Sequence, residues 1–361
     1  MISLHSSAIK ASLHCSVSFS AKSLIRLPFT GKRDLSVVSA SGKPPLSSNN
    51  DSRRISSQVG ESFFRSVLGQ MESVYLNRNP TPKSVLELVR SVDGNEQLCY
   101  DHLAFRTFGI GGYGIDSLAS FFLDYGYTPM DELRFPAKKL RALWFAPPND
   151  GSDVPCGSGV NGPLPRVFIS ELLVEQMSSQ AQDVIRKYTE ASPGGKKYAA
   201  MSSALGSLPW EKPLSTEFEQ LASESEYAAW TLVNGYALNH VTISVHRLKS
   251  HLNKIKKLNQ FLEEKGFKLN SEGGVLKVSP DGGLQQSSTV ADSISFKFSD
   301  GVVKSIPCSY IEFAERLVLP LYQNVPENEI QESHRRDGFE VGNADKIFES
   351  TYQDQLSRRT G

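Results

Sequence analysis

The spacing of hydrophobic and polar residues changes along the chain between a helical period and a strand-like one. Apolar side chains recur at three- and four-residue spacing over residues 57–75 and 248–265, which predicts amphipathic helices. Residues 115–125 follow the same pattern. The turn at Pro80 and Pro82 marks the start of another predicted helix.

Strands are predicted where aromatic and branched residues form short apolar runs bounded by turn residues. These runs fall at residues 100–108, 141–146, 166–170, 238–246, 275–279, 293–298 and 309–314. Residues 147–165 are rich in proline, glycine and serine and predict a loop. We therefore expect one catalytic domain over residues 51–361, with two halves of like element order at about 95–175 and 235–316. A helical insertion of about 176–230 separates them.

The balance of positive and negative residues argues against nucleic acid and anionic membranes as binding partners. Lysine and arginine number 39, as do aspartate and glutamate, so no net attraction to nucleic acid or to an anionic membrane is expected. No apolar run approaches the ~20 residues that a membrane-spanning helix needs. The four cysteines are scattered along the chain, which argues against a disulfide framework and favours a reducing compartment.

The first ~50 residues differ from the rest in composition. They are rich in serine, they contain six lysines and arginines, and Asp34 is the only acid before Asp51. This composition predicts a disordered transit peptide, and the excess of serine over arginine favours the plastid over the mitochondrion. An ordinary disordered tail is the alternative.

Two histidines and one acid are the candidate metal ligands. His102 and His240 lie near the start of the leading strand of each half, and Glu312 lies among apolar residues of a late strand. Two imidazoles and one carboxylate leave coordination positions open, as in non-heme Fe(II) enzymes that bind an oxo acid and dioxygen. Zinc or manganese could occupy the same set. Each residue also has a structural interpretation, as a packed core histidine or as an acid paired with Arg316.

Arg106 is the candidate substrate-binding residue. Side chains of a strand alternate with period two, so Arg106 shares a face with His102, and four strand residues separate them by ~13 Å. A guanidinium at that distance suits a second carboxylate, which favours a dicarboxylic substrate. The alternative is a structural ion pair with Asp101 or Glu171. Weaker pocket candidates are Tyr310 and Ser244, and surface or packing roles are expected for His246, His251 and His334.

At these residues the chain resembles the 2-oxoadipate dioxygenase/decarboxylase family, whose plant members are plastid proteins. The resemblance runs from about residue 63 to residue 352 and rests on residues 101–106, 239–242, 310–316, 338–340 and 343–350. It implies an α+β fold of the vicinal-oxygen-chelate type. In that fold, paired strand-helix-strand-strand-strand modules form a sheet that curls around one metal, here with added helices.

The resemblance also implies roles for the candidate residues. The family's metal ligands match His102, His240 and Glu312, its cofactor is Fe(II), and its substrate-binding arginine matches Arg106. The family reaction converts 2-oxoadipate and dioxygen to 2-hydroxyglutarate and carbon dioxide in lysine catabolism, here expected in the plastid stroma. Two alternatives stay open: a non-oxidative metal-dependent lyase or isomerase on the same fold, and a non-catalytic protein of plastid development.

Overall fold

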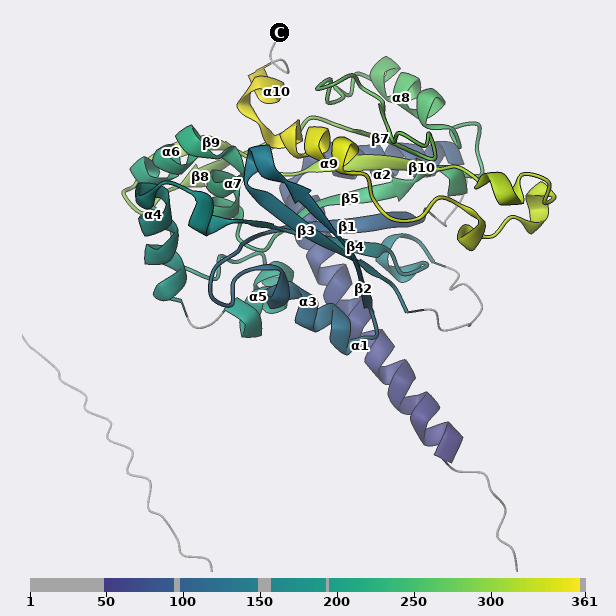
Figure 1. Cartoon of the computed structure of the whole chain (residues 1–361), viewed down its shortest axis with the longest axis horizontal. Coiled ribbons are helices and arrows are strands. Elements are labelled where there is room, and N and C mark those ends of the chain that lie inside the picture. Colours follow the sequence, from purple (N-terminus) through teal and green to yellow (C-terminus); the bar gives the residue numbers. More distant parts are fainter. Residues whose placement is uncertain (1–48, 94–97, 149–156, 193–194, 358–361) are drawn as a thin grey trace, which may run out of the picture. The chain divides into compact units, whose positions relative to one another are not determined.

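A computed structural model of the chain describes residues 49–93, 98–148, 157–192 and 195–357 (Figure 1). Residues 1–48 of the predicted transit peptide and residues 149–156 of the predicted loop lie outside this description. The same holds for Cys15 and Cys156, whereas Cys99 and Cys308 are both buried. None of the helices within the described ranges has the length and apolarity needed to cross a membrane.

The described strands form one large sheet and one small one. The large sheet has the order β2-β3-β4-β1-β5-β10-β7-β6, and β8 pairs with β9 in the small sheet. Their bounds are β1 Tyr100–Phe108, β2 Thr128–Phe135, β3 Leu140–Ala146, β4 Arg166–Leu172, β5 Leu238–Ser244, β6 Lys277–Val278, β7 Leu284–Ser288, β8 Ser293–Lys297, β9 Val303–Pro307 and β10 Tyr310–Arg316.

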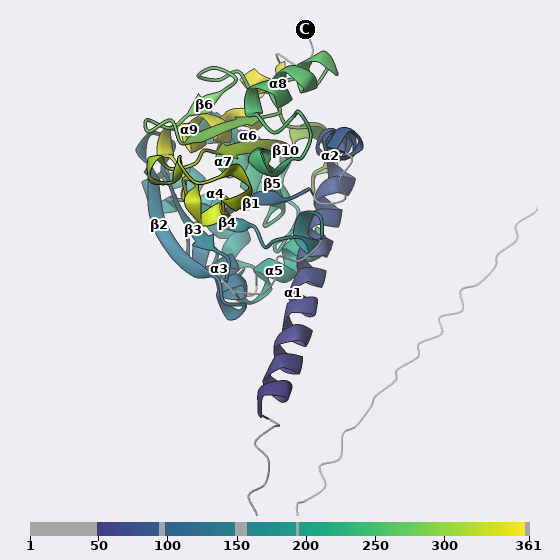
Figure 2. The same ribbon diagram turned by 90° about the vertical axis from the view of Figure 1, so that its right-hand side faces the viewer.

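Helices cover both faces of the large sheet. One group, α1, α2, α3 and α8, contacts the strands of one face, and α1 runs beside the sheet next to α2 and α5 (Figure 2). Helices α7 and α9 contact the other face. The helix bounds are α1 Asn49–Arg78, α2 Pro80–Asp93, α3 Ile115–Asp124, α4 Ser179–Glu190, α5 Gly195–Leu205, α6 Ser215–Glu224, α7 Glu226–Asn234, α8 Ile255–Glu264, α9 Val341–Ile347 and α10 Gln353–Ser357.

The two ends of the large sheet have the same order of elements. In the first, β1 is followed by α3 and by the meander β2-β3-β4, which returns to lie parallel to β1. In the second, β5 is followed by α8, β6 and β7, and β10 returns to lie parallel to β5. The two leading strands, β1 and β5, pair antiparallel at the centre. This is the mixed α+β fold with a curled sheet that the sequence predicts.

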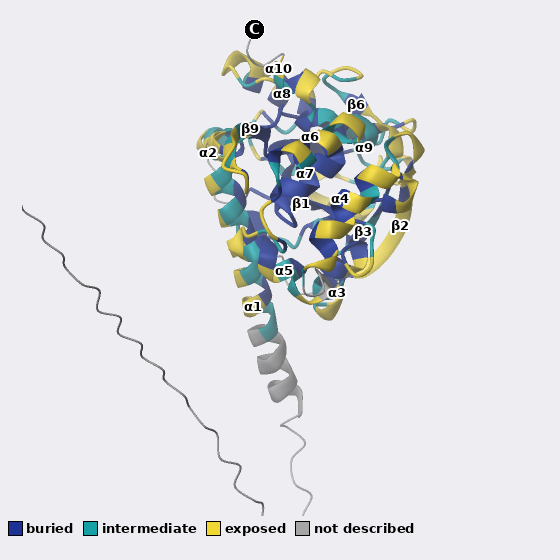
Figure 3. Cartoon of the chain, turned by 90° about the vertical axis from the view of Figure 1, so that its left-hand side faces the viewer, coloured by how far each residue is buried: buried dark blue, intermediate teal, exposed yellow. Residues whose placement is uncertain are grey.

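The strands with aromatic and branched residues are confirmed. Strand β1 spans the predicted residues, and β3, β4, β5 and β10 each agree with prediction to within two residues at either end. The central strands are buried on both faces, and Figure 3 shows the buried residues concentrated in the strands and on the inner sides of the helices. Because both faces of these strands are buried, their sequences form apolar runs, and such runs predict strands.

Several elements differ from prediction. Strand β2 was missed because it is an exposed edge strand with proline and charged residues, and β7 was missed because its sequence, LQQSS, is polar. The strand predicted at residues 293–298 is β8, but it belongs to the small sheet. The helix predicted over 248–265 begins only at Ile255, because residues 245–247 form a 3-10 turn that is followed by a loop. The strand predicted at 275–279 is reduced to two residues.

We expect the apolar face of β5 to be essential for stability. Ile243 is fully buried on the face opposite His240, so Ile243→Ala should lower the free energy of unfolding by about 2–5 kcal/mol. Leu321→Ala, at a side chain that is 81% exposed, should change it by less than about 0.5 kcal/mol. Urea denaturation followed by circular dichroism measures both, and equal midpoints for the two variants would contradict this placement of the core.

Candidate metal centre

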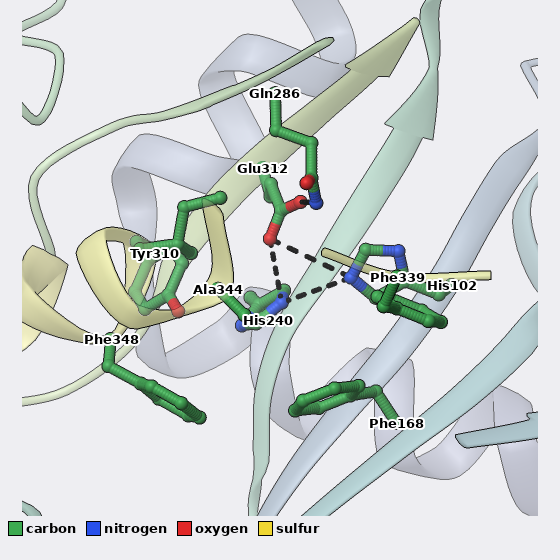
Figure 4. Close-up of a pocket in the computed structure, with 10 residues that line it drawn as sticks. His102, Phe168, His240, Gln286, Tyr310, Glu312, Phe339, Ala344 and Phe348 are labelled. Atoms are coloured by element: carbon green, nitrogen blue, oxygen red, sulfur yellow. Dashed lines mark hydrogen bonds and ion pairs between the residues drawn. The ribbon is translucent and has the colours of Figure 1, made fainter. Parts of the chain in front are cut away.

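Three neighbouring strands present the candidate ligands on one face of the sheet. His102 lies on β1, His240 on the adjacent β5 and Glu312 on β10, which pairs with β5 (Figure 4). In the register, His102 and Glu312 both lie opposite Thr242, so side-chain alternation directs them to the side from which His240 projects. The structure therefore brings together all three residues that the sequence singles out as ligands.

The ligand atoms form a small triangle. The Nε2 atoms of His102 and His240 are 3.4 Å apart, and Oε2 of Glu312 lies 3.0 Å from Nε2 of His240 and 3.6 Å from Nε2 of His102. Ligands that bind one metal at about 2.1 Å lie about 3.0–3.4 Å from one another. All three side chains are buried, and among the described residues this is the one group of histidines, cysteines and acids close enough to hold a metal ion. The donor set fits a divalent cation.

Each imidazole is held by a partner on its far nitrogen. Nδ1 of His102 is 2.8 Å from Oδ1 of Asp101, and Nδ1 of His240 is 2.9 Å from Oδ1 of Asn239. An ionised carboxylate only accepts hydrogen bonds, so Nδ1 of His102 donates to Asp101 and its Nε2 is left to face the triangle. The polar residue before each histidine in the sequence therefore orients the imidazole of that histidine.

The two histidines and the carboxylate of the triangle shift one another's pKa values. Burial alone raises the pKa of Glu312, but His102 and His240 outweigh burial and lower it to about 2. Burial lowers the pKa of His240 to about 4, whereas Glu312 and Asp101 overcome the burial of His102 and raise its pKa. At neutral pH the triangle thus contains one carboxylate and a neutral His240.

Asp101 is itself bound by a buried arginine. Nε and Nη2 of Arg316 donate to the two carboxylate oxygens of Asp101 at 2.6 and 3.0 Å, and both side chains are fully buried. Burial raises the pKa of Asp101, but Arg316 and then His102 and Arg166 hold it well below its usual range. Nη1 of Arg316 also donates to the main-chain oxygens of Arg336 and Gly338. The structural alternative for Glu312, a pair with Arg316, is therefore wrong.

Arg106 is buried without a carboxylate partner among the described residues. Its Nη1 donates to Oγ1 of Thr351 at 3.0 Å, and its Nη2 donates to the main-chain oxygen of Phe348 at 3.1 Å. Its guanidinium carbon lies 5.1 Å from the ring centre of Tyr227 and 4.9 Å from that of Trp230. The Nε atom has no hydrogen-bond partner. A buried cation held only by neutral groups can accept an anionic ligand.

The structural alternatives for Arg106 are also wrong. Asp101 is paired with Arg316, and Glu171 accepts a hydrogen bond from Nε of Arg141 at 2.6 Å. Arg106 shares a face of β1 with His102, because the register of β1 against β4 runs without a shift from His102 to Arg106.

A small cavity lies over the triangle. Besides the three ligands it is lined by aromatic residues and a few others, among them Phe168, Gln286, Tyr310, Phe339 and Phe348 (Figure 4). Tyr310 stacks on His240, and its buried hydroxyl has no hydrogen-bond partner. Arg106 does not line the cavity, although it packs against Phe348, which does.

Several residues of this site were not among the candidates that the sequence singles out. Gln286 lies on the missed strand β7, and Phe339, Phe348 and Thr351 belong to the C-terminal segment, more than 200 positions from Arg106. Among the weaker candidates, Tyr310 lines the cavity and Ser244 does not. His246 binds Glu332 and His334 stacks on Tyr322, both outside the triangle.

Removing Arg316 should be costly because it leaves the Asp101 charge buried. We expect Arg316→Met to lower the free energy of unfolding by about 3–5 kcal/mol at pH 7. Lys187→Met, which breaks an ion pair with Glu217 at a half-exposed lysine, should cost no more than about 1 kcal/mol. Urea denaturation compares the two variants, and equal losses would contradict the importance of the buried pair.

The ion pair of Asp101 and Arg316 should make the free energy of unfolding depend on pH. Because the folded pKa of Asp101 is depressed, its stabilising contribution is fully present above the unfolded pKa of about 3.9 and is lost as the pH falls toward the folded pKa. The stability difference between the native chain and Arg316→Met should therefore narrow below about pH 4. Denaturation midpoints at pH 7 and pH 3.5 test this, and a difference that grows on acidification would contradict it.

Solved structures define the class of the protein. The crystal structure of the hydroxyglutarate synthase from Oryza sativa in complex with 2-oxoadipate matches with a TM-score of 0.80 at 62% identity, covering 89% of this chain and all of that one. A glyoxalase superfamily protein from Ralstonia eutropha matches in fold alone, with a TM-score of 0.59 at 18% identity, covering 77% of this chain and 86% of that one. The chain is an α+β protein of the vicinal-oxygen-chelate type.

Its sequence matches a narrower group within that class. Residues 67–331 match the family described as 2-oxoadipate dioxygenase/decarboxylase. The chloroplastic 2-oxoadipate dioxygenase/decarboxylase of Arabidopsis thaliana is 85% identical over 373 residues, and the match covers 100% of both chains. The chain belongs to the 2-oxoadipate dioxygenase/decarboxylase family, as the resemblance in its strands implies.

Proposed function

We propose that this chain is an Fe(II)-dependent enzyme that converts 2-oxoadipate and dioxygen to 2-hydroxyglutarate and carbon dioxide. The single observation that supports the proposal most is the buried triangle of His102, His240 and Glu312, in a family whose relatives are named as 2-oxoadipate dioxygenase/decarboxylases. The name of the Arabidopsis relative supports a plastid location, for which we propose the stroma, and we propose lysine catabolism as the pathway.

We propose His102, His240 and Glu312 as the ligands of iron(II). Two imidazoles and a carboxylate leave coordination positions for a 2-oxo acid and dioxygen, and iron(II), when bound, supplies the template and the electron transfer that dioxygen chemistry requires. Zinc would suit the same donors, but it has no redox chemistry and does not account for a dioxygenase. The protein contributes ligand orientation through Asp101 and Asn239.

The electrons balance without a further cosubstrate. Oxidative loss of the C1 carboxylate as carbon dioxide and hydroxylation of the shortened acid together supply every electron that reduces dioxygen. One oxygen atom ends in the new carboxylate and the other in the new hydroxyl group. The aromatic side chains of Phe168, Phe339 and Phe348, which line the cavity, would exclude water from this chemistry.

We propose that Arg106 binds the distal carboxylate of the substrate. Its guanidinium is buried, forms no ion pair with an acid among the described residues, and lies on the same face of β1 as His102. The unpartnered hydroxyl of Tyr310 and the unpartnered Nε of Arg106 are two donors available for that carboxylate. The rice relative, 62% identical, was crystallised with 2-oxoadipate, which supports a substrate with two carboxylates.

The domain organisation belongs to the same proposal. We propose a transit peptide of about 50 residues followed by one catalytic domain, with halves at about 95–175 and 235–316 and a helical insertion at about 176–230. The insertion would serve the site, because Tyr227 and Trp230 of α7 pack against Arg106.

Turnover by the iron-loaded chain tests the proposal. Residues 51–361 are loaded with Fe(II) without oxygen, and oxygen uptake, carbon dioxide release and 2-hydroxyglutarate are then measured with 2-oxoadipate. We expect equal amounts of the two products per oxygen consumed. Turnover of 2-oxoadipate without oxygen uptake would favour the lyase or isomerase alternative, and no turnover despite bound iron would favour a non-catalytic protein.

Loss of any ligand should remove the metal. We expect His102→Ala, His240→Ala and Glu312→Ala to retain little iron after gel filtration and to lose activity, because two ligands bind iron(II) weakly. His251→Ala, at an exposed residue outside the triangle, should bind one iron per chain. Elemental analysis measures the iron content, and a fully loaded and active Glu312→Ala protein would contradict the ligand assignment.

Arg106 should affect substrate binding and leave the metal in place. Losing one partner of a buried charge pair costs about 2–5 kcal/mol, so Arg106→Ala should raise the KM for 2-oxoadipate by about 30-fold or more. Iron content should be unchanged.

A substrate analogue separates this role from a general disturbance of the site. Any oxygen uptake with 2-oxohexanoate, which lacks the distal carboxylate, should be insensitive to Arg106→Ala. An unchanged KM for 2-oxoadipate in the variant would exclude Arg106 as the carboxylate-binding residue.

A further inference from the structure

The two carboxylate oxygens of Glu312 have different neighbours. Its Oε2 atom faces the two histidines, and its Oε1 atom accepts a hydrogen bond of 2.6 Å from Nε2 of Gln286 (Figure 4). Gln286 lies on β7, the strand next to β10, and lines the cavity. The oxygen that is turned away from the histidines is therefore occupied by a neutral donor.

A second amide fixes the orientation of Gln286. Nδ2 of Asn343, on α9, donates to Oε1 of Gln286 at 3.0 Å. Because the Glu312 carboxylate only accepts hydrogen bonds, the Nε2 end of Gln286 must face Glu312 and its Oε1 end must face Asn343. Asn343 thus donates to Gln286, and Gln286 donates to Glu312. All three side chains are buried.

The arrangement determines how Glu312 can bind a metal. A carboxylate with both oxygens free can take two coordination positions, whereas one whose Oε1 is held by a short hydrogen bond presents only Oε2. We propose that Gln286, oriented by Asn343, is a positioning residue that keeps Glu312 a one-oxygen ligand. This inference rests on the proposed function, in which the positions left open by the three ligands receive the 2-oxo acid and dioxygen.

Gln286 completes a pattern among the three ligands. Asp101 holds the far side of His102, Asn239 holds the far side of His240, and Gln286 holds the far oxygen of Glu312. A neutral donor is required at Glu312, because an acid at position 286 would repel the carboxylate and would donate no hydrogen bond when ionised. Asn343 also connects this set to the C-terminal segment that lines the cavity.

Metal binding by matched variants of the purified chain tests the proposal. Gln286→Met keeps the length of the side chain and removes the donor, Gln286→Glu adds a charge, and Asn343→Ala removes the group that orients Gln286. Ser287→Ala is the control, because Ser287 is a buried neighbour on β7 that donates to Asn259 on the opposite face of the sheet. Fe(II) affinity is measured anaerobically by competition with a chelator, and the absorption spectrum of bound Co(II) reports the coordination geometry.

We expect Gln286→Met and Gln286→Glu to weaken Fe(II) binding by about 10–100-fold and to change the Co(II) spectrum. Asn343→Ala should act in the same direction with a smaller effect, and Ser287→Ala should match the native chain. Native affinity and spectrum in Gln286→Met, or an equal loss in Ser287→Ala, would overturn the proposal. If Gln286→Met does not fold, the result for Asn343→Ala decides.

These measurements separate a failure of the role proposed for Gln286 from a failure of the proposed reaction. A native chain that binds Fe(II) tightly but consumes no oxygen with 2-oxoadipate contradicts the proposed reaction, while the affinities of the variants still decide the role of Gln286. A native chain that binds neither Fe(II) nor Co(II) overturns both.

Discussion

The burial of the Glu312 carboxylate is the constraint on which the rest of the structure depends. An ionised carboxylate removed from water is strongly destabilising unless charged or polar partners surround it. Here two imidazoles face one oxygen and an amide faces the other, so both carboxylate oxygens have polar partners. A divalent cation in that centre would compensate the charge more fully than the histidines alone.

The same constraint explains the layers of contacts around the triangle. Each candidate ligand forms a hydrogen bond on the side away from the triangle centre. Asp101, which accepts this bond from His102, is itself paired with Arg316. Arg316 then binds the main chain at residues 336 and 338, which places Phe339 over His102 with ring centres 4.8 Å apart. The C-terminal segment therefore covers the site because a buried ion pair anchors it.

The three candidate ligands could be singled out from the sequence because they lie on strands with strong local signals, and the structure brings them together. His102 and His240 occur within buried, branched and aromatic runs, and period-two alternation sufficed to place Arg106 on the face of His102. The fold class followed from the order of such runs together with the family resemblance.

The remaining features depend on contacts between distant parts of the chain. Strand β7 is polar because Gln286 and Ser288 face the site, so its sequence carries no strand signal. The surroundings of Arg106 come from α7 and from Phe348 and Thr351, and no local pattern in the sequence connects these segments. The loop before α8 contains apolar residues at helical spacing, but Leu252 packs into the core without continuing the helix.

Anomalous diffraction at the iron edge, from crystals of the chain grown without oxygen and loaded with Fe(II), tests the central claim most directly. The account predicts a single strong peak at about 2.1 Å from Nε2 of His102, Nε2 of His240 and Oε2 of Glu312. Iron bound at another position, or an empty triangle in crystals that contain iron elsewhere, would contradict it.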